Sequence, residues 1–270
     1  MTSSVRTDLV EARARSLCER AAAASWSADS ALDWQELAFE RMPGATRRAM
    51  AALYTDVLFA ESFGVELVRR LVERAPEGWL RRFAQLQLED ELRHVRFFTL
   101  LVRALGEPVE PAAALVTLRD EIGRSRDHDE LLLHAQIIEL SAQSVFLANS
   151  KRSLRLLSSA VQLPATASVA ALLRCIVANV GGDESRHIAF GHGYLRARLG
   201  ALPAERRLDL ARRAGSSAQL MHQAFRERAP HMRRLGFSEP DLAGFFPGIQ
   251  AQLVKLGVVI ADLPCIESEC

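Results

Sequence analysis

Apolar residues recur every three or four positions along most of the chain, which is the spacing of amphipathic helices. Four long stretches with this pattern lie between about residues 45 and 199, and two turn signals separate them in pairs. The first signal is Pro76-Glu77-Gly78 and the second is Leu163-Pro164. No stretch shows the strict alternation that is typical of a β-strand. The sequence therefore predicts an all-α fold with a core of four helices.

Shorter helical patterns flank this core. They lie at about residues 6–24, 34–41, 111–122 and 204–228. No Pro/Gly/Ser-rich linker or change in composition divides the chain, so we expect a single domain over residues 1–270. Residues 45–199 would form the four-helix core, with accessory helices in residues 1–44 and 200–270. After residue 228 we expect a less regular tail that packs on the bundle; covering a channel or forming a homodimer are the alternatives.

The most informative motif is Asp-Glu-x-Arg-His, which occurs at residues 90–94 and again at 183–187. A Glu and a His three residues apart leave one face of a helix, so both can bind one cation. A single Glu-x-x-His on a helix is usually surface charge. Two copies that also share Asp and Arg predict two helices that each supply a pair of ligands to a two-metal site.

Such a site needs further carboxylates from the other two core helices, and Glu61 fits the first position. Glu61 lies 15 residues before Pro76, and Glu91 lies 15 residues after it. In an antiparallel hairpin, equal distances from the turn place two residues at the same height. The competing Glu66 would be misplaced by about 7.5 Å at 1.5 Å of rise per residue. We therefore select Glu61.

Glu139 is selected for the second position because it is the only Asp or Glu between Leu131 and Gly182. A carboxylate in so apolar a helix is costly unless it is paired, hydrogen-bonded or bound to metal. Its height fits less well, since Glu139 lies 25 residues before Pro164 but Glu184 only 20 after it. We expect a kink, bulge or irregular stretch within about residues 150–159 to absorb the difference.

The predicted metal ligands are four carboxylates and two imidazoles: Glu61, Glu91, His94, Glu139, Glu184 and His187. Four anionic oxygens balance two divalent ions, and this mixed set suits iron, with manganese possible, better than structural zinc. Asp90 and Asp183 are expected to accept the ring N–H of the ligand His on the opposite helix, and Arg93 and Arg186 to pair with those carboxylates.

These residues resemble the ferritin-like, carboxylate-bridged di-iron superfamily. It includes ribonucleotide reductase small subunits, acyl-carrier-protein desaturases, para-aminobenzoate N-oxygenases and hydroxylase subunits of bacterial multicomponent monooxygenases, and the doubled motif is most similar to the last group. The resemblance implies a ferritin-like bundle over residues 45–199. Two positions depart from it. Phe98 stands where a reductase subunit carries its radical tyrosine, and Val180 where the N-oxygenases have an additional histidine.

Composition excludes several other classes of protein. The net charge of +1 gives no general attraction to nucleic acid or to acidic membranes. No apolar run reaches membrane-spanning length, and early charges such as Arg6 and Asp8 exclude a secretory signal. The cysteines Cys18, Cys175, Cys265 and Cys270 form no Cys-x-x-Cys pair, which favours free thiols and a cytoplasmic location.

Small or apolar residues near the predicted ligands indicate a pocket for a small organic substrate. We expect Phe97, Phe98, Val180 and Gly181 to line it, and we interpret the missing side chains at Gly181, Gly182 and Gly191 as room for oxygen or substrate. The resemblance implies a di-iron hydroxylase, N-oxygenase or desaturase with O₂ as co-substrate. Electrons would come from a separate reductase or ferredoxin, because no flavin- or NAD-binding fingerprint is present. The alternative is a ferroxidase or iron-handling protein.

Overall fold

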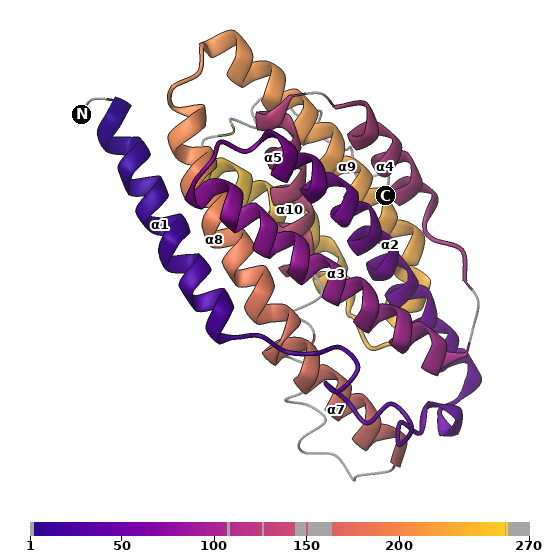
Figure 1. The fold of residues 1–270 in the computed structure, drawn as a ribbon. Helices are drawn as coiled ribbons and strands as arrows, with labels where there is room; N and C mark the ends of the chain where they lie inside the picture. The colour runs from indigo at the N-terminus through magenta and orange to yellow at the C-terminus, as the bar shows by residue number, and fades with distance from the viewer. Residues whose placement is uncertain are drawn as a thin grey trace, which may run out of the picture.

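The computed structural model describes residues 3–106, 109–125, 127–143, 150, 164–256 and 258. Across those ranges the regular elements are all helices, and the core is a bundle in which α2 and α3 pack beside α5 and α8 (Figure 1). Its helices are α2 (Gly44–Arg74), α3 (Trp79–Leu105), α5 (His128–Ser141), α7 (Pro164–Ala178) and α8 (Val180–Leu199). The all-α prediction is confirmed. None of the helices in these ranges is both long and apolar enough to span a membrane.

The first core hairpin, α2 and α3, is regular. Helix α2 ends where Ala75 becomes extended before Pro76, and Gly78 then takes a φ of 97° directly ahead of α3. That left-handed conformation favours glycine because it has no Cβ. The expected turn at residues 76–78 is therefore confirmed, and the two long helices run antiparallel against each other (Figure 1).

The second core hairpin contains two irregularities. Residues 142–143, directly after α5, are π-helical, and π turns of this kind often occur at functional sites. The fourth core helix is interrupted at Asn179, so that α7 ends at Ala178 and α8 begins at Val180. The irregular stretch predicted for residues 150–159 lies, apart from Ser150, outside the described residues.

Accessory helices cover the bundle from two sides. Helix α1 (Ser3–Ala23) packs against α3 and α8, and a short 3₁₀ turn (Phe39–Arg41) precedes α2 (Figure 1). On the other side, α4 (Ala113–Arg124) and α9 (Ala204–Arg234) pack against α2, and α9 also contacts α5.

Helix α10 (Glu239–Lys255) follows and packs on α9 and α5. The prediction of a less regular tail is wrong for these residues. The Ser238 side chain accepts from the Asp241 backbone N–H and the Asp241 side chain accepts from the Ser238 backbone, a capping box that starts a helix despite the nearby prolines.

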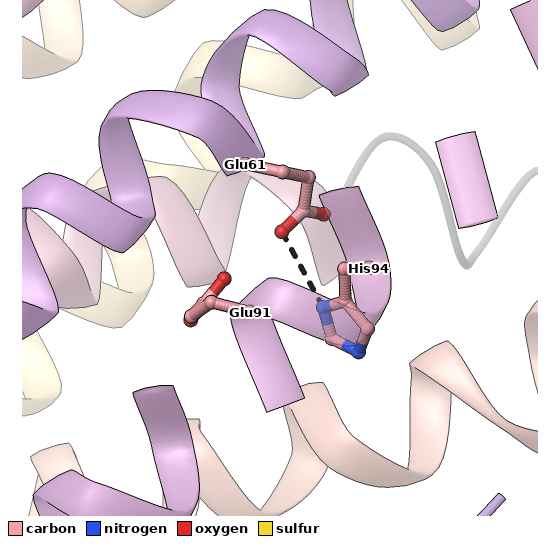
Figure 2. A group of neighbouring side chains, drawn as sticks. All are labelled: Glu61, Glu91 and His94. Carbon is pink, nitrogen blue, oxygen red and sulfur yellow. Dashed lines mark ion pairs between the residues drawn. The ribbon is translucent and has the colours of Figure 1, made fainter. Parts of the chain in front are cut away.

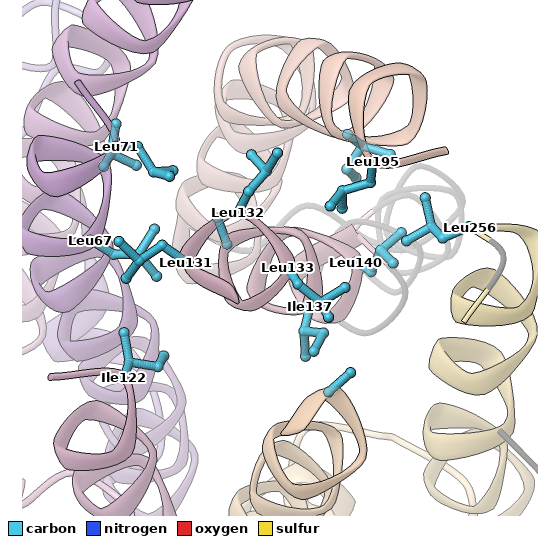
Figure 3. Close-up of a cluster of buried hydrophobic side chains, with 14 of the residues drawn as sticks. Leu67, Leu71, Ile122, Leu131, Leu132, Leu133, Ile137, Leu140, Leu195 and Leu256 are labelled. Carbon is cyan, nitrogen blue, oxygen red and sulfur yellow. The ribbon is translucent and has the colours of Figure 1, made fainter. Parts of the chain in front are cut away.

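The main apolar core joins these layers. Its buried side chains come from α1, α2, α3, α4, α5, α8, α9 and the end of the α10 region. Figure 3 labels ten of them: Leu67, Leu71, Ile122, Leu131, Leu132, Leu133, Ile137, Leu140, Leu195 and Leu256. Burying a Leu or Ile side chain contributes about 1.5–3 kcal/mol. The central position of α5 in this core holds the helix that carries Glu139 at a fixed depth.

Candidate metal centre

The six predicted ligands meet inside the bundle. Glu61 comes from α2, Glu91 and His94 from α3, Glu139 from α5, and Glu184 and His187 from α8. All are buried except Glu61, which is half-buried. Four helices thus contribute polar side chains to one region of an otherwise apolar interior.

Two groups of possible ligands share one residue. In the first group, one ligand atom each from Glu61, Glu91 and His94 lies within 4.8 Å of the others, and Figure 2 shows the three side chains converging. In the second group, the same holds for Glu91, Glu139 and His187. Because Glu91 belongs to both groups, its carboxylate lies where it could bind two cations at once.

Both imidazoles of the predicted ligand set point Nδ1 toward the carboxylates. His94 Nδ1 lies 3.3 Å from Glu61 Oε2 and 3.3 Å from Glu184 Oε1. His187 Nδ1 lies 3.1 Å from Glu139 Oε1 and 3.7 Å from Glu91 Oε1. Glu184 thus joins the His94 side of the centre.

The other ring nitrogens make crossed contacts. His94 Nε2 lies 3.2 Å from Asp183 Oδ2 on α8, and His187 Nε2 lies 3.1 Å from Asp90 Oδ2 on α3. A carboxylate at Nε2 holds the proton there and leaves the Nδ1 lone pair for a cation. Each motif therefore orients the histidine of the other motif.

The two motif arginines close this network. Arg93 contacts Asp90 and lies 3.4 Å from Asp183, while Arg186 contacts Asp183 and lies 3.2 Å from Asp90. Each buried aspartate thus has two guanidinium partners, which offset the cost of burying its charge.

Trp26 is a further member of the network that the sequence did not suggest. Its indole Nε1 donates to Asp183 Oδ2 at 2.9 Å, and the Arg93 guanidinium lies 5.3 Å from the centre of its ring. Trp26 lies in an irregular segment after α1, where no helical pattern indicates which way a side chain points.

Two glutamines near the predicted ligands have distinct roles. Gln87 Nε2 donates to Glu139 Oε1 at 2.9 Å and to Glu91 Oε1 at 3.4 Å, so it holds two predicted ligands together. Gln136 is buried against α8 at Gly191, where an added Cβ would lie 1.5 Å from Gln136 Oε1. Gly191 therefore makes room for Gln136, and the interpretation that it makes room for oxygen or substrate is wrong.

Helix α5 also carries Asp129, which accepts from Arg198 Nε at 2.9 Å, and Glu130. Glu130 takes part in a separate polar cluster. Its Oε1 accepts from Ser125 Oγ at 2.8 Å and from Arg213 Nη1 at 2.9 Å, and it lies 3.5 Å from His134 Nε2. These contacts account for its buried carboxylate without a metal, which leaves Glu139 as the acid that α5 directs to the centre.

The centre's electrostatics suit a pair of cations. Burial, together with repulsion from Glu139, raises the pKa of both Glu91 and Glu184 well above the usual range. Burial also acts on Glu139, but the adjacent His187 lowers the Glu139 pKa to about 2. For His94, burial is outweighed by Glu61 and Asp183, which raise its pKa to about 10. Divalent cations would replace the protons that these groups otherwise share.

Among the predicted ligands, two buried atoms lack a hydrogen-bond partner within the described residues: His94 Nδ1 and Glu184 Oε2. Buried polar atoms are rarely left unsatisfied, and those at a functional site often face a missing ion. The four carboxylates and two imidazoles, which include these two unpartnered atoms, fit a di-metal centre of iron or manganese.

A cavity of about 90 Å³ opens from the centre, and all four predicted glutamate ligands line it. The expected Phe98 and Val180 are in its wall, together with Ser141 at the end of α5 and Ala142 at the π turn. Phe97 is not, because it packs edge-on against Trp26 and Trp34 instead. Gly181 is also absent from the lining residues within the described ranges, so these two predictions are wrong.

The cavity's outer wall comes from accessory helices. Met221, Ala224, Phe225 and Arg228 of α9 line it, as does Leu115 of α4. The α9 helix therefore does more than pack on the bundle, since it forms part of the cavity wall.

Comparison with solved structures identifies the fold. A variant of an R2-like ligand-binding oxidase with a reconstituted Mn/Fe cofactor matches with a TM-score of 0.54 and 15% identity, over 90% of this chain and 92% of that chain. A second such variant matches with a TM-score of 0.49 and 16% identity, over 92% of this chain and 89% of that chain. No family model and no curated protein matches the sequence. The bundle is therefore ferritin-like, as the sequence predicts.

Proposed function

We propose that this chain is an oxygen-activating di-metal oxidoreductase that acts on a small organic substrate. Its ligands would be Glu61, Glu91, His94, Glu139, Glu184 and His187. They would hold two iron ions, or one manganese and one iron, as the Mn/Fe cofactor of the R2-like oxidase with the same fold suggests. Glu91 would bind both ions because it belongs to both ligand groups.

One observation carries this proposal: the two ligand groups that share Glu91 open directly onto a cavity with mostly apolar walls. A metal pair that only stabilised the fold would have no need of such a space. Apolar walls suit an oxidase because they keep water away from reactive oxygen species and accept an organic substrate.

The protein's own residues would prepare the site. When bound, the two ions supply the redox chemistry with O₂. Asp90 and Asp183 hold the histidine protons at Nε2, so that both Nδ1 atoms face the centre. Gln87 fixes the relative positions of Glu91 and Glu139. The cavity wall between α2, α5 and α9 binds and orients the substrate.

Hydroxylation, N-oxygenation and desaturation of the substrate are all compatible with this site. Each reduces O₂ with electrons from the substrate and with further electrons from an external donor, and we propose that a separate reductase or ferredoxin supplies the latter. The chain would work without nucleic acid or membrane as partner, in the cytoplasm.

A ferroxidase is the alternative function, because clustered carboxylates also bind and release ferrous iron. Turnover separates the two. The metal-depleted protein is supplied with excess ferrous iron under air, and iron oxidation is followed with time. We expect oxidation to stop after about one equivalent of the di-iron centre, because the iron is a fixed cofactor. Continued oxidation of many irons per chain, with formation of a mineral, would establish the ferroxidase instead.

A further inference from the structure

The end of the cavity away from the metal centre carries an ion pair. Arg228 of α9 donates from Nε to Asp56 Oδ2 at 2.7 Å and from Nη2 to Asp56 Oδ1 at 2.9 Å. The Ala112 backbone N–H also donates to Asp56 Oδ1 at 2.8 Å, and Arg228 Nη2 reaches the Glu110 carbonyl. Both Asp56 and Arg228 line the cavity. The pair thus joins α2, α9 and the segment ahead of α4 at the cavity's far end.

Some hydrogen-bond donors of the Arg228 guanidinium are not used by the ion pair. A guanidinium has five N–H groups, and its Nε and Nη2 are engaged by Asp56 and Glu110. Arg228 Nη1 makes no hydrogen bond to any residue of the described ranges. The guanidinium is held in place by its bidentate contact, so these donors are fixed in direction before any ligand arrives.

The walls between the two ends are apolar. The apolar lining residues include Val57 and Ala60 of α2, Leu115 of α4 and Met221, Ala224 and Phe225 of α9. Asp56 and Glu61 are five residues apart on α2, which corresponds to about 7.5 Å along the helix axis. A molecule that fills this space needs an apolar body of roughly that length and polar atoms at one end only.

We propose that Arg228 determines substrate specificity by donating to an oxygen acceptor, a carbonyl or a carboxylate, at one end of an apolar substrate. The other end of the substrate then faces the glutamates of the metal centre, so the oxidised position is remote from the acceptor group. Asp56 is a positioning residue that aims the guanidinium. Because Asp56 already balances the charge of Arg228, a neutral carbonyl is held as well as an anion. The direction of the substrate rests on the proposed function, whereas the contact with Arg228 does not.

Calorimetric titration with three probes of equal chain length tests this contact. Hexanoate and hexanamide carry the acceptor, and hexylammonium carries only donors. We expect the first two to bind the metal-depleted and the iron-loaded protein alike, and hexylammonium to bind at least about tenfold more weakly. Comparable binding of all three probes, or binding of none, overturns the proposal.

Variants locate the acceptor group. Arg228→Met should weaken hexanoate and hexanamide by about tenfold or more, since a hydrogen bond to a charged group is lost. Arg226→Met, at an exposed position on the same helix, is the matched control and should change nothing. If Arg228→Met does not fold because Asp56 is left unpaired, the double variant Asp56→Asn with Arg228→Met removes both charges together, leaves no donor at position 228 and should show the same loss. If hexanoate and hexanamide bind only the iron-loaded protein and Arg228→Met does not weaken them, the acceptor group lies at the metals and the proposal is contradicted.

A contradiction of that kind leaves the proposed function standing, because the iron-oxidation experiment does not depend on Arg228. Conversely, if excess iron is oxidised without limit while Arg228→Met still weakens hexanoate, the oxygenase proposal fails and the binding role of Arg228 survives.

Discussion

The two halves of the candidate metal centre carry nearly identical motifs on very different helices. In the first half, α2 and α3 are uninterrupted over 31 and 27 residues and place Glu61, Glu91 and His94. In the second half, α5 runs into a π turn at residues 142–143, and the fourth core helix breaks at Asn179 before α8. The irregular points flank Glu139 and Glu184.

The regular half fixes the positions of the predicted ligands, and the irregular half contributes to the shape of the cavity. Ala142 at the π turn and Val180 directly after the break both line the cavity. Regular helices bring side chains to equal heights, but they pack too closely to leave space between them. The first half therefore acts as the frame that fixes ligand positions, and the second half deviates from regular geometry where the cavity opens. Substitutions in the two halves should therefore differ in their effects on metal binding and on stability.

The largest effect is expected at the residue that both halves share. Glu91→Ala should abolish tight binding of both metal ions, because its carboxylate belongs to both ligand groups. Metal analysis after iron loading and desalting measures the number of ions retained. Glu66→Ala is the matched control, since Glu66 is exposed on α2 and should leave both ions bound. Retention of two ions by Glu91→Ala would show that the halves do not share a ligand.

Glu139→Ala should affect one half only. We expect one ion to be lost or loosened while circular dichroism still shows the folded bundle, because Glu139 faces His187 and Glu91 and not the apolar core. Glu130→Ala serves for comparison, because its carboxylate is engaged by Ser125 and Arg213. Two tightly bound ions and unchanged oxygen reactivity in Glu139→Ala would remove α5 from the ligand set.

A smaller effect is expected from the crossed contacts. Asp183→Asn should weaken metal affinity by about 10–100-fold, since it orients His94 without touching an ion. Asp90→Asn should do the same through His187. Competition with a chelator measures both affinities. Equal losses of metal affinity in the two variants would mean that the crossed contacts link the halves symmetrically. Unchanged affinity in both variants would mean that these contacts stabilise the fold and do not orient the histidines for metal binding.

The smallest effect concerns the packing of the second half. Gly191→Ala should lower the free energy of unfolding by about 1–3 kcal/mol, because its Cβ would overlap Gln136. Gly182→Ala, whose Cβ would meet nothing within 4 Å, should stabilise α8 by up to about 1 kcal/mol. Urea unfolding of the two metal-depleted variants gives the comparison. A Gly191→Ala protein as stable as Gly182→Ala would mean that Gln136 moves aside freely.

The sequence predicted the frame better than the cavity, for a physical reason. Helical periodicity and a proline turn fix which residues share a face and a height, so the spacing of residues 61, 91 and 94 was enough to select the first half. Glu139 followed from the cost of burying a carboxylate. The use of these residues as metal ligands remains a prediction that the experiments above test.

Contacts between distant segments could not be read from spacing. Trp26 lies 157 positions before Asp183 and belongs to no periodic pattern. The pairing of Asp56 with Arg228 depends on how α9 packs over α2, which no local pattern specifies. The prediction that Phe97 lines the cavity was wrong. It rested on the short sequence distance between Phe97 and His94, whereas Phe97 packs against Trp26 and Trp34 of the segment after α1.

The most direct test of the account is the metal content and magnetic coupling of the iron-loaded protein. Iron analysis combined with Mössbauer spectroscopy measures both on one sample. The account predicts two irons per chain that are magnetically coupled, because Glu91 would link them. One iron or fewer per chain, or two irons without coupling, would contradict a shared di-metal centre.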